Sequence, residues 1–145
     1  MKTLNHMRLE FDGKPENESF ARIAVAAFAV PMNPTMDVLS DIRTAVSEAV
    51  TNAIVHAYHE QGGVIVLTAA LMENGVLALS VSDQGCGIPD VDQAMQPFYT
   101  TQPEKERSGM GFAVMQSFMD SLRVESQVGQ GTTVYMEKLL RARGN

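Results

Sequence analysis

The sequence predicts an α/β protein of the α+β type, organised as a two-layer sandwich in which helices cover one face of a mixed, mainly antiparallel sheet. Two pairs of alternating apolar segments, each joined by a glycine-containing turn, are typical of β-hairpins. Other segments repeat their apolar residues at helical spacing, so each predicted helix has one face to bury. Such elements bury their apolar surfaces most simply when the helices pack together on one side of the sheet.

Length and composition indicate one domain that spans residues 1–145. The chain is 45% hydrophobic, which is enough for a folded core, and no internal repeat or linker divides it. A net charge of −6 without any run of Lys or Arg argues against a nucleic-acid-binding protein. The chain has neither a signal-peptide pattern nor an apolar run of membrane-spanning length. Because Cys86 is its only cysteine, no internal disulfide can form, and we expect a cytoplasmic protein.

The first part of the chain predicts a strand and two helices. Residues 6–11 alternate apolar and polar side chains, as a short strand does. Residues 15–30 predict an apolar helix that begins with a proline and has acidic residues in its first turn. Two prolines end this helix. A long helix follows over residues 37–59, with Thr35 or Asp37 as its cap.

The second part of the chain predicts two hairpins with a helix between them. In chain order we expect strands over 64–72 and 76–82, a loop over 83–90, a helical turn over 91–95, a helix over 109–120, and strands over 122–128 and 132–139. Asn74-Gly75 between the first two strands is a strong hairpin signal. Residues 97–108 have no periodicity, and such a long irregular segment is either a functional lid or disordered.

The long helix carries a polar stripe with two interpretations. Glu48, Asn52 and His56 are spaced by four residues and therefore share one face. An amphipathic helix usually has a solvated face of this kind. However, asparagine is a poor helix former, and a carboxylate one turn from an amide oxygen suits a hard cation such as Mg²⁺.

Two glycine-rich segments are candidates for ligand binding. Asp83-Gln-Gly85-Cys-Gly87 directly follows a strand, where glycine permits close backbone approach and the carboxylate can accept from an exocyclic amine. Residues 107–112 precede a helix, whose N-terminal amides form an anion site. An ordinary turn and an ordinary helix start are the alternatives. The spacings exclude a P-loop, a Rossmann fingerprint and an EF-hand.

Taken in order, these motifs resemble those of the GHKL ATPases over residues 37–134. The series is Glu-x-x-x-Asn, Asp-x-Gly-x-Gly-Ile, Ser-Gly-Met-Gly-Phe and Gly-Thr-Thr, and the resemblance implies the Bergerat ATP-binding fold. Within that family, the chain is similar to the anti-sigma-factor serine kinases of spore-forming bacteria. Four segments carry this closer resemblance: 17–22, 47–53, 100–101 and 106–112.

The resemblance implies ATP and Mg²⁺ as cofactors and assigns roles along the chain. Asn52 would coordinate Mg²⁺, and Glu48 would be the general base that takes the proton of the acceptor serine. Asp83 would bind the adenine amine. The remaining nucleotide contacts would come from Gly85, Gly87, Thr101, Ser108, Gly109, Met110, Gly111 and Thr132.

For three residues, both a functional and a purely structural interpretation stay open. Arg107 would reach the γ-phosphate or be an ordinary lid arginine, and His56 would line the pocket or pack in the helix. Arg22 would contact the protein partners or be a plain surface residue. There are also departures from the family: Gly109 and Gly111 lack a third glycine, and Gln102 stands where related lids often carry lysine. Cys86 receives no role.

The resemblance implies a homodimer that binds and inhibits a sporulation sigma factor. With Mg-ATP it would also phosphorylate a serine of its anti-anti-sigma factor and so inactivate that antagonist. One alternative is a nucleotide-gated binding module without kinase activity. The other is a detached GHKL ATPase domain that serves a different partner.

Overall fold

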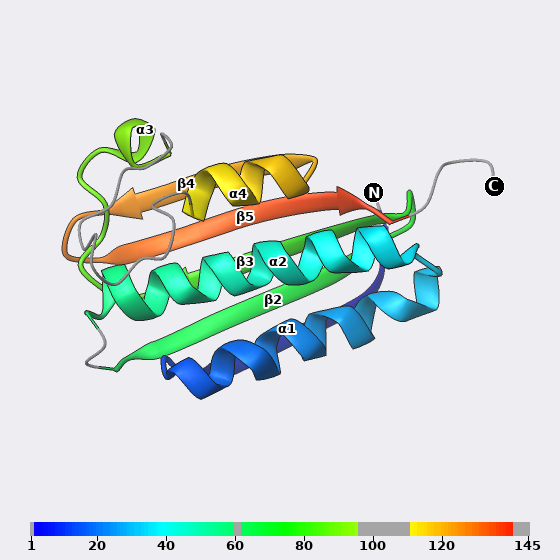
Figure 1. Cartoon of the computed structure of the whole chain (residues 1–145), viewed down its shortest axis with the longest axis horizontal. Coiled ribbons are helices and arrows are strands. Elements are labelled where there is room, and N and C mark those ends of the chain that lie inside the picture. The colour runs from blue at the N-terminus through cyan, green and yellow to red at the C-terminus, as the bar shows by residue number, and fades with distance from the viewer. Residues whose placement is uncertain (1, 60–61, 96–110, 141–145) are drawn as a thin grey trace.

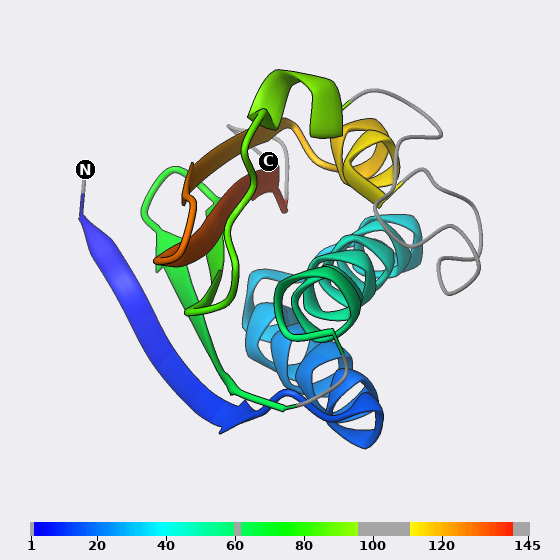
Figure 2. The same ribbon diagram turned by 90° about the vertical axis from the view of Figure 1, so that its left-hand side faces the viewer.

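The computed structural model describes residues 2–59, 62–95 and 111–140, and these residues form two layers. The sheet has five strands in the order β1-β2-β3-β5-β4. In the end-on view of Figure 2, the strands form a curved layer and the three longer helices lie together on one side of it. The predicted two-layer α+β architecture is confirmed, and every strand pairing in the described residues is antiparallel.

The first three strands lie side by side at one side of the sheet (Figure 1). β1 (Thr3–Asp12) is the edge strand and pairs with β2 (Val64–Met72), which pairs in turn with β3 (Val76–Asp83). A tight turn joins β2 to β3, where the Gly75 amide bonds the Met72 carbonyl at 2.9 Å. The Asn-Gly signal therefore predicted this hairpin correctly.

The second hairpin brings three strand ends together. β4 (Ser121–Gln127) pairs with β5 (Gly131–Leu139), and β5 also pairs with β3. Thr132 lies opposite Asp83 on one side and opposite Ser126 on the other. These three residues consequently form a row across one end of the sheet.

The first helical segment covers the sheet near β1 and β2. α1 (Pro15–Ala29) begins with a proline, which fits the first turn because that turn needs no amide donor there. A short 3-10 segment, η1 (Val30–Met32), follows, and Asn33 then adopts a left-handed conformation with φ of 54°. Left-handed asparagine is a common way to end a helix.

α2 (Met36–Asn52) is the central helix and packs between α1 and α4 (Figure 1). The Thr35 hydroxyl accepts the Val38 amide at 3.2 Å, which confirms the threonine cap. The helix was expected to continue unchanged to residue 59. Instead its last turn widens into a π-helix, η2 (Ala53–Ala57), and His59 ends it with φ of 50°. Such wide turns depend on tertiary contacts and frequently mark functional sites.

Two shorter helices complete the helical layer. α3 (Val91–Ala94) is capped by Asp90, whose carboxylate accepts the Gln93 amide at 3.0 Å. α4 (Gly111–Phe118) packs against α2. The expected lid, residues 97–108, and the first two residues of the expected helix over 109–120 lie outside the described residues.

The core lies between α2 and the sheet. From α2, Ile42, Val46 and Val50 are fully buried, and they are matched by buried strand residues such as Ile65 and Leu77. Full burial of side chains of this size contributes about 1.5–3 kcal/mol each. This packing sets the rotation of α2 and turns its polar stripe away from the sheet.

A partly buried lysine links the two layers beyond the core. The Lys138 ammonium on β5 donates to the Phe118 carbonyl at 2.7 Å and pairs with the Asp41 carboxylate of α2 at 3.3 Å. It therefore gives the last carbonyl of α4 a hydrogen-bond donor. No helix in the described ranges is both long enough and apolar enough to span a membrane.

We expect Thr35→Ala to lower the free energy of unfolding by about 1 kcal/mol, because the Val38 amide loses its capping acceptor. Urea denaturation measures the change. Thr44→Ala is the matched control, since the Thr44 hydroxyl bonds a carbonyl within the helix and alanine favours the helix more. Equal losses in the two variants would contradict the role of Thr35 as the cap.

Candidate functional site

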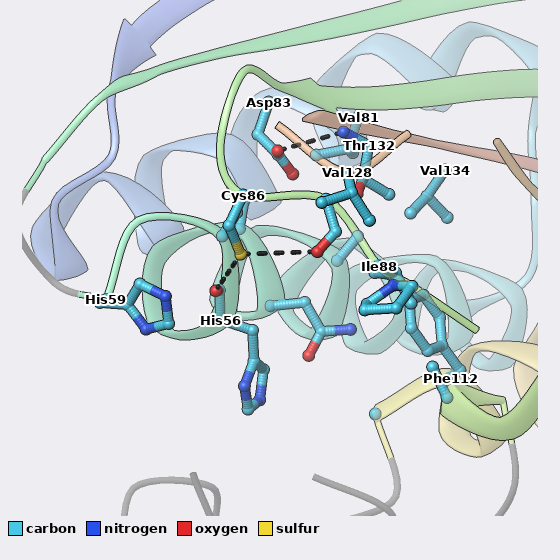
Figure 3. Close-up of a pocket in the computed structure, with 18 residues that line it drawn as sticks. His56, His59, Val81, Asp83, Cys86, Ile88, Phe112, Val128, Thr132 and Val134 are labelled. Carbon is cyan, nitrogen blue, oxygen red and sulfur yellow. Dashed lines mark hydrogen bonds between the residues drawn. The ribbon is translucent and has the colours of Figure 1, made fainter. Parts of the chain in front are cut away.

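A cavity of about 350 Å³ opens between the end of α2, the loop after β3 and the start of β5 (Figure 3). Its walls are mainly apolar and include Val81, Ile88, Phe112 and Val134. A few polar side chains reach it from separate segments. An apolar cavity with a few convergent polar groups is the usual form of a small-molecule site.

Asp83 is the main charged group of this cavity. Its Oδ1 accepts the Gly85 amide at 3.0 Å and the Thr132 amide at 3.2 Å. Partial burial raises the pKa of this carboxyl, and the two amide bonds oppose that rise only in part. Because both bonds fall on Oδ1, Oδ2 retains its capacity to accept a hydrogen bond from a ligand.

The glycines after Asp83 let the loop pack tightly between two other segments. A Cβ on Gly85 would come within 2.5 Å of the Ala57 carbonyl oxygen in η2. Gly87 has φ of 79°, and a Cβ there would lie 2.3 Å from the Gln127 carbonyl oxygen at the end of β4. Gly87 lines the cavity, whereas Gly85 is not part of its lining and contacts η2 instead.

Backbone bonds hold the loop on both sides. The Cys86 amide donates to the Ala57 carbonyl at 3.2 Å, and the Cys86 carbonyl accepts the Gly129 amide at 2.8 Å. The widened turn η2 therefore receives a partner from a distant segment, which a sequence pattern along one helix does not reveal. Cys86 also lines the cavity, with its thiol 3.3 Å from the His56 carbonyl oxygen (Figure 3).

Tyr58 is a second anchor of the loop that the motifs did not indicate. Its hydroxyl donates to the Val64 carbonyl at 2.6 Å and accepts the Gln84 amide at 2.7 Å. Burial is the largest cause of its raised pKa. The Tyr58 ring occupies the space that a Cβ on Gly63 would need. The Gly-Gly pair before β2 was therefore the one local sign of this contact in the sequence.

Thr132 and its neighbours form the polar end of the cavity. The Thr132 side chain is buried, with 7% exposed, and its Oγ1 lies 2.7 Å from the Ser126 Oγ. Gly131 has φ of 114°, and a Cβ there would lie 2.1 Å from the Asp83 carbonyl oxygen. Glycine is required here because β5 starts in direct contact with the end of β3.

The polar stripe of α2 reaches the cavity at Asn52 and His56, which both line it. Glu48 lies one turn earlier and is partly buried. The described residues contain no cluster of three or more His, Cys, Asp or Glu that could hold a metal ion. The Asn52 amide oxygen can be a single protein ligand of Mg²⁺, because this ion usually takes most of its other ligands from substrate phosphates and water.

The structure brings together residues predicted from four separate motifs. Asn52, Asp83, Gly87, Gly111 and Thr132 all line the cavity, and Gly111 begins α4 beside it. Five other predicted site residues lie outside the described residues, and they are Thr101, Arg107, Ser108, Gly109 and Met110.

Arg22 lies apart from the cavity on α1. Its guanidinium pairs with the Glu18 carboxylate at 3.5 Å, and 40% of its side chain is exposed. The described structure therefore separates one expected partner-binding residue from the residues expected to bind nucleotide.

Comparison with known proteins identifies the family. Residues 11–138 match the model of the histidine kinase-like ATPase domain. The chain belongs to this family. It is 55% identical over 134 residues to an anti-sigma F factor of Geobacillus kaustophilus, covering 92% of each chain. It is also 54% identical over 142 residues to an anti-sigma F factor of Pasteuria penetrans, covering 97% of this chain and 95% of the relative.

A solved structure supports the fold of this ATPase family. The RsbU and RsbW domains of Rv1364c from Mycobacterium tuberculosis align with a TM-score of 0.69 at 21% identity, covering 95% of this chain and 33% of the other. The expected GHKL relationship is thereby confirmed, and the cavity lies within an ATP-binding type of domain.

We expect Asp83→Asn to raise the midpoint of thermal unfolding at neutral pH. The raised pKa means that the folded state holds the Asp83 proton to higher pH than the unfolded state, whose pKa is near the ordinary 3.8. Stability therefore falls as pH rises from that value through the folded pKa, and it stays lower above it. Asparagine keeps the Oδ1 acceptor but avoids the buried charge.

The difference in unfolding midpoint between wild type and Asp83→Asn should shrink as the pH falls toward the ordinary pKa of an aspartate carboxyl. Calorimetry across this range measures it, and Asp12→Asn at the exposed end of β1 is the control. A gain from Asp83→Asn that does not change with pH would show that the buried charge is not its cause.

Proposed function

We propose that this protein is both an anti-sigma factor and a protein serine kinase. It binds and inhibits a sporulation sigma factor, and it uses Mg-ATP to phosphorylate a serine of its anti-anti-sigma factor. The observation that carries the proposal is the convergence of Asn52, Asp83, Gly111 and Thr132 on one apolar cavity. Identity of 55% to an anti-sigma F factor over nearly the whole chain supports the regulatory role.

The adenine base occupies the end of the cavity that holds Asp83 and Thr132. Adenine offers an exocyclic amine to the carboxylate, whereas guanine offers a carbonyl oxygen at the same position. Leaving a buried acceptor without a donor costs about 1–3 kcal/mol. The apolar walls, which include Ile88 and Val134, bury the faces of the ring.

The phosphates lie toward Asn52 and the start of α4. Asn52 would hold Mg²⁺, and the ion would neutralise charge on the phosphates. The amides at the start of α4, from Gly111 and the residues before it, contact the phosphate oxygens. We assign Ser108, Gly109 and Met110 to this cradle on the family motif, and Thr101 to the lid over it.

Glu48 is the general base of the transfer. The acceptor serine loses its hydroxyl proton to the Glu48 carboxylate, and its oxygen forms a bond to the γ-phosphorus. The bond from that phosphorus to the bridging oxygen of ADP breaks, and ADP leaves. A positioned base contributes about 10²–10⁴-fold in rate. Arg107 is assigned to the γ-phosphate, where it stabilises the charge that develops.

Protein partners bind on the α1 side of the molecule. Arg22 is partly exposed there, and its ion pair with Glu18 is weak enough to exchange for a partner contact. We assign Arg22 to both the sigma factor and the anti-anti-sigma factor. The acidic net charge is consistent with a cytoplasmic protein that binds neither nucleic acid nor membrane directly.

A homodimer accounts for an apolar stripe on the outer face of α1. Phe20 and Ile23 on α1 are 51% and 62% exposed, Ala27 continues the same face, and Val30 at the start of η1 is 53% exposed. Their spacing of three, four and three residues keeps them in one row. β1 beside this helix is an edge strand within the described sheet, so a second copy can extend the contact.

We expect Glu48→Gln to bind ATP like the wild type but to transfer phosphate at least about 100-fold more slowly. The assay uses labelled ATP, Mg²⁺ and the anti-anti-sigma protein. Removal of Mg²⁺ by EDTA is the control. Full activity of the variant would exclude Glu48 as the base.

The same assay separates the alternatives. Label on a histidine, or release of free phosphate, would indicate a detached ATPase domain. ATP binding without any transfer by the wild type would indicate a nucleotide-gated binding module.

We expect Ile23→Glu to convert the dimer to a monomer by placing a charge within the apolar stripe. Sedimentation velocity measures the change, and the dissociation constant should rise at least about tenfold. Phe118→Glu, on α4, is the control with a similar substitution outside the stripe. A mass that is the same for wild type and Ile23→Glu would rule out this interface.

A further inference from the structure

We propose that Ser126 is a positioning residue that determines the base specificity of the nucleotide site. It holds the Thr132 hydroxyl in an orientation that offers only lone pairs to the cavity, so that Thr132 and Asp83 together select an amino group. The inference rests on the proposed function, since it concerns the base of the nucleotide that the cavity binds.

Ser126 lies at the end of β4, directly opposite Thr132 in the strand register. Its Oγ has three polar neighbours. The Ile88 amide lies at 2.7 Å, the Gly131 carbonyl oxygen at 3.1 Å and the Thr132 Oγ1 at 2.7 Å. A serine hydroxyl has one proton and two lone pairs, so these three neighbours use its full capacity.

Two of these neighbours have only one possible role, and the role of the third follows from them. The Ile88 amide can only donate, so it takes one lone pair of Ser126. The Gly131 carbonyl can only accept, so it takes the Ser126 proton. With the Ser126 proton on the Gly131 carbonyl, one lone pair remains for the third neighbour, and we infer that Thr132 donates its own proton to Ser126.

The proton of Thr132 is thus used inside the protein. The Thr132 Oγ1 keeps lone pairs for the cavity, which this side chain lines. Beside it, the ionised Asp83 carboxylate is also only an acceptor, and the Thr132 amide bonds its Oδ1 (Figure 3). The polar end of the cavity therefore presents two neighbouring acceptors within apolar walls.

Two acceptors require a ligand edge that carries donors. The exocyclic amine of adenine has two N–H groups and meets this requirement. Hypoxanthine has a carbonyl oxygen at the same ring position, which would face acceptors and lose its hydrogen bonds to water. Ser126 contributes to this selection without touching the nucleotide, because it decides which way the Thr132 proton points.

Removing Ser126 should weaken the discrimination between ATP and inosine triphosphate. In Ser126→Ala the Thr132 hydroxyl is free to rotate and to donate to the hypoxanthine carbonyl. We expect the ratio of the two dissociation constants to move toward unity by about tenfold, the effect of about one hydrogen bond. Calorimetric titration of the full chain with each nucleotide and Mg²⁺ measures this ratio.

The ratio of the two dissociation constants shows whether Ser126 positions Thr132 or has only a structural role. If Ser126 only anchors the loop through Ile88, its loss weakens both nucleotides equally and leaves the ratio unchanged, which would overturn the proposal. Ser126→Thr, which keeps the hydroxyl, should retain the wild-type ratio. Ser126→Cys keeps the size of the side chain with much weaker hydrogen bonding, and it should change the ratio in the same direction even if the alanine variant folds poorly.

Ser82→Ala is a matched control. The Ser82 Oγ also bonds a threonine hydroxyl, that of Thr133 at 2.9 Å, and the two residues precede and follow Asp83 and Thr132 in sequence. Alternation along the strands places this pair on the opposite face of the sheet, away from the cavity. Its loss should leave the nucleotide ratio at the wild-type value.

Asp83→Asn distinguishes failure of this inference from failure of the proposed site. If that variant loses the preference for ATP while Ser126→Ala keeps it, the base site is correct and the role of Ser126 is wrong. If the wild type prefers neither nucleotide and Asp83→Asn changes nothing, the proposed base site is wrong, and the inference falls with it.

Discussion

The two amide bonds to Asp83 Oδ1 are the interaction on which the cavity depends. One comes from Gly85 and turns the loop away from the end of β3, and the other comes from Thr132 and holds the start of β5 against it. Because the loop then bonds the Ala57 carbonyl of η2, these contacts also connect the sheet to the end of α2. One carboxylate thereby joins the segments that surround the cavity.

The site combines features that disfavour folding with a scaffold that tolerates them. Two features of the site reduce the stability of the folded state: the partly buried Asp83 carboxylate, whose pKa is raised, and the apolar cavity beside it. The left-handed His59 adds backbone strain at the same end of α2. Fully buried residues on α2 and the central strands, such as Val46 and Ile65, supply the compensating hydrophobic burial. The apolar walls of the cavity, which include Val81 and Val134, belong to the same core.

Much of the fold was predictable because its signals are local. Alternation and Asn74-Gly75 predicted the first hairpin, and Thr35 predicted the start of α2. The cavity residues Asn52, Asp83 and Thr132 were predictable for a different reason, since their motifs occur in a recognisable order. Tyr58 and Ser126 were not predictable in this way, because each bonds an amide from a distant segment, that of Gln84 or Ile88, and neither residue belongs to a motif.

The sequence by itself determined most of the strands and helices and the polar stripe along α2, because each depends on residues near one another in the chain, and it determined the acidic net charge. Tertiary structure alone decided three further properties: the widening of the last turn of α2, the packing of Gly85 against it and the direction of the hydroxyl bonds around Ser126. The first two are relations between groups that meet only when the sheet packs against the helices, and the third depends on the Ile88 amide from a segment distant in the chain. A hydrogen bond has a direction only once both of its partners are in place, so the selectivity that we propose for the site is a property of the folded molecule.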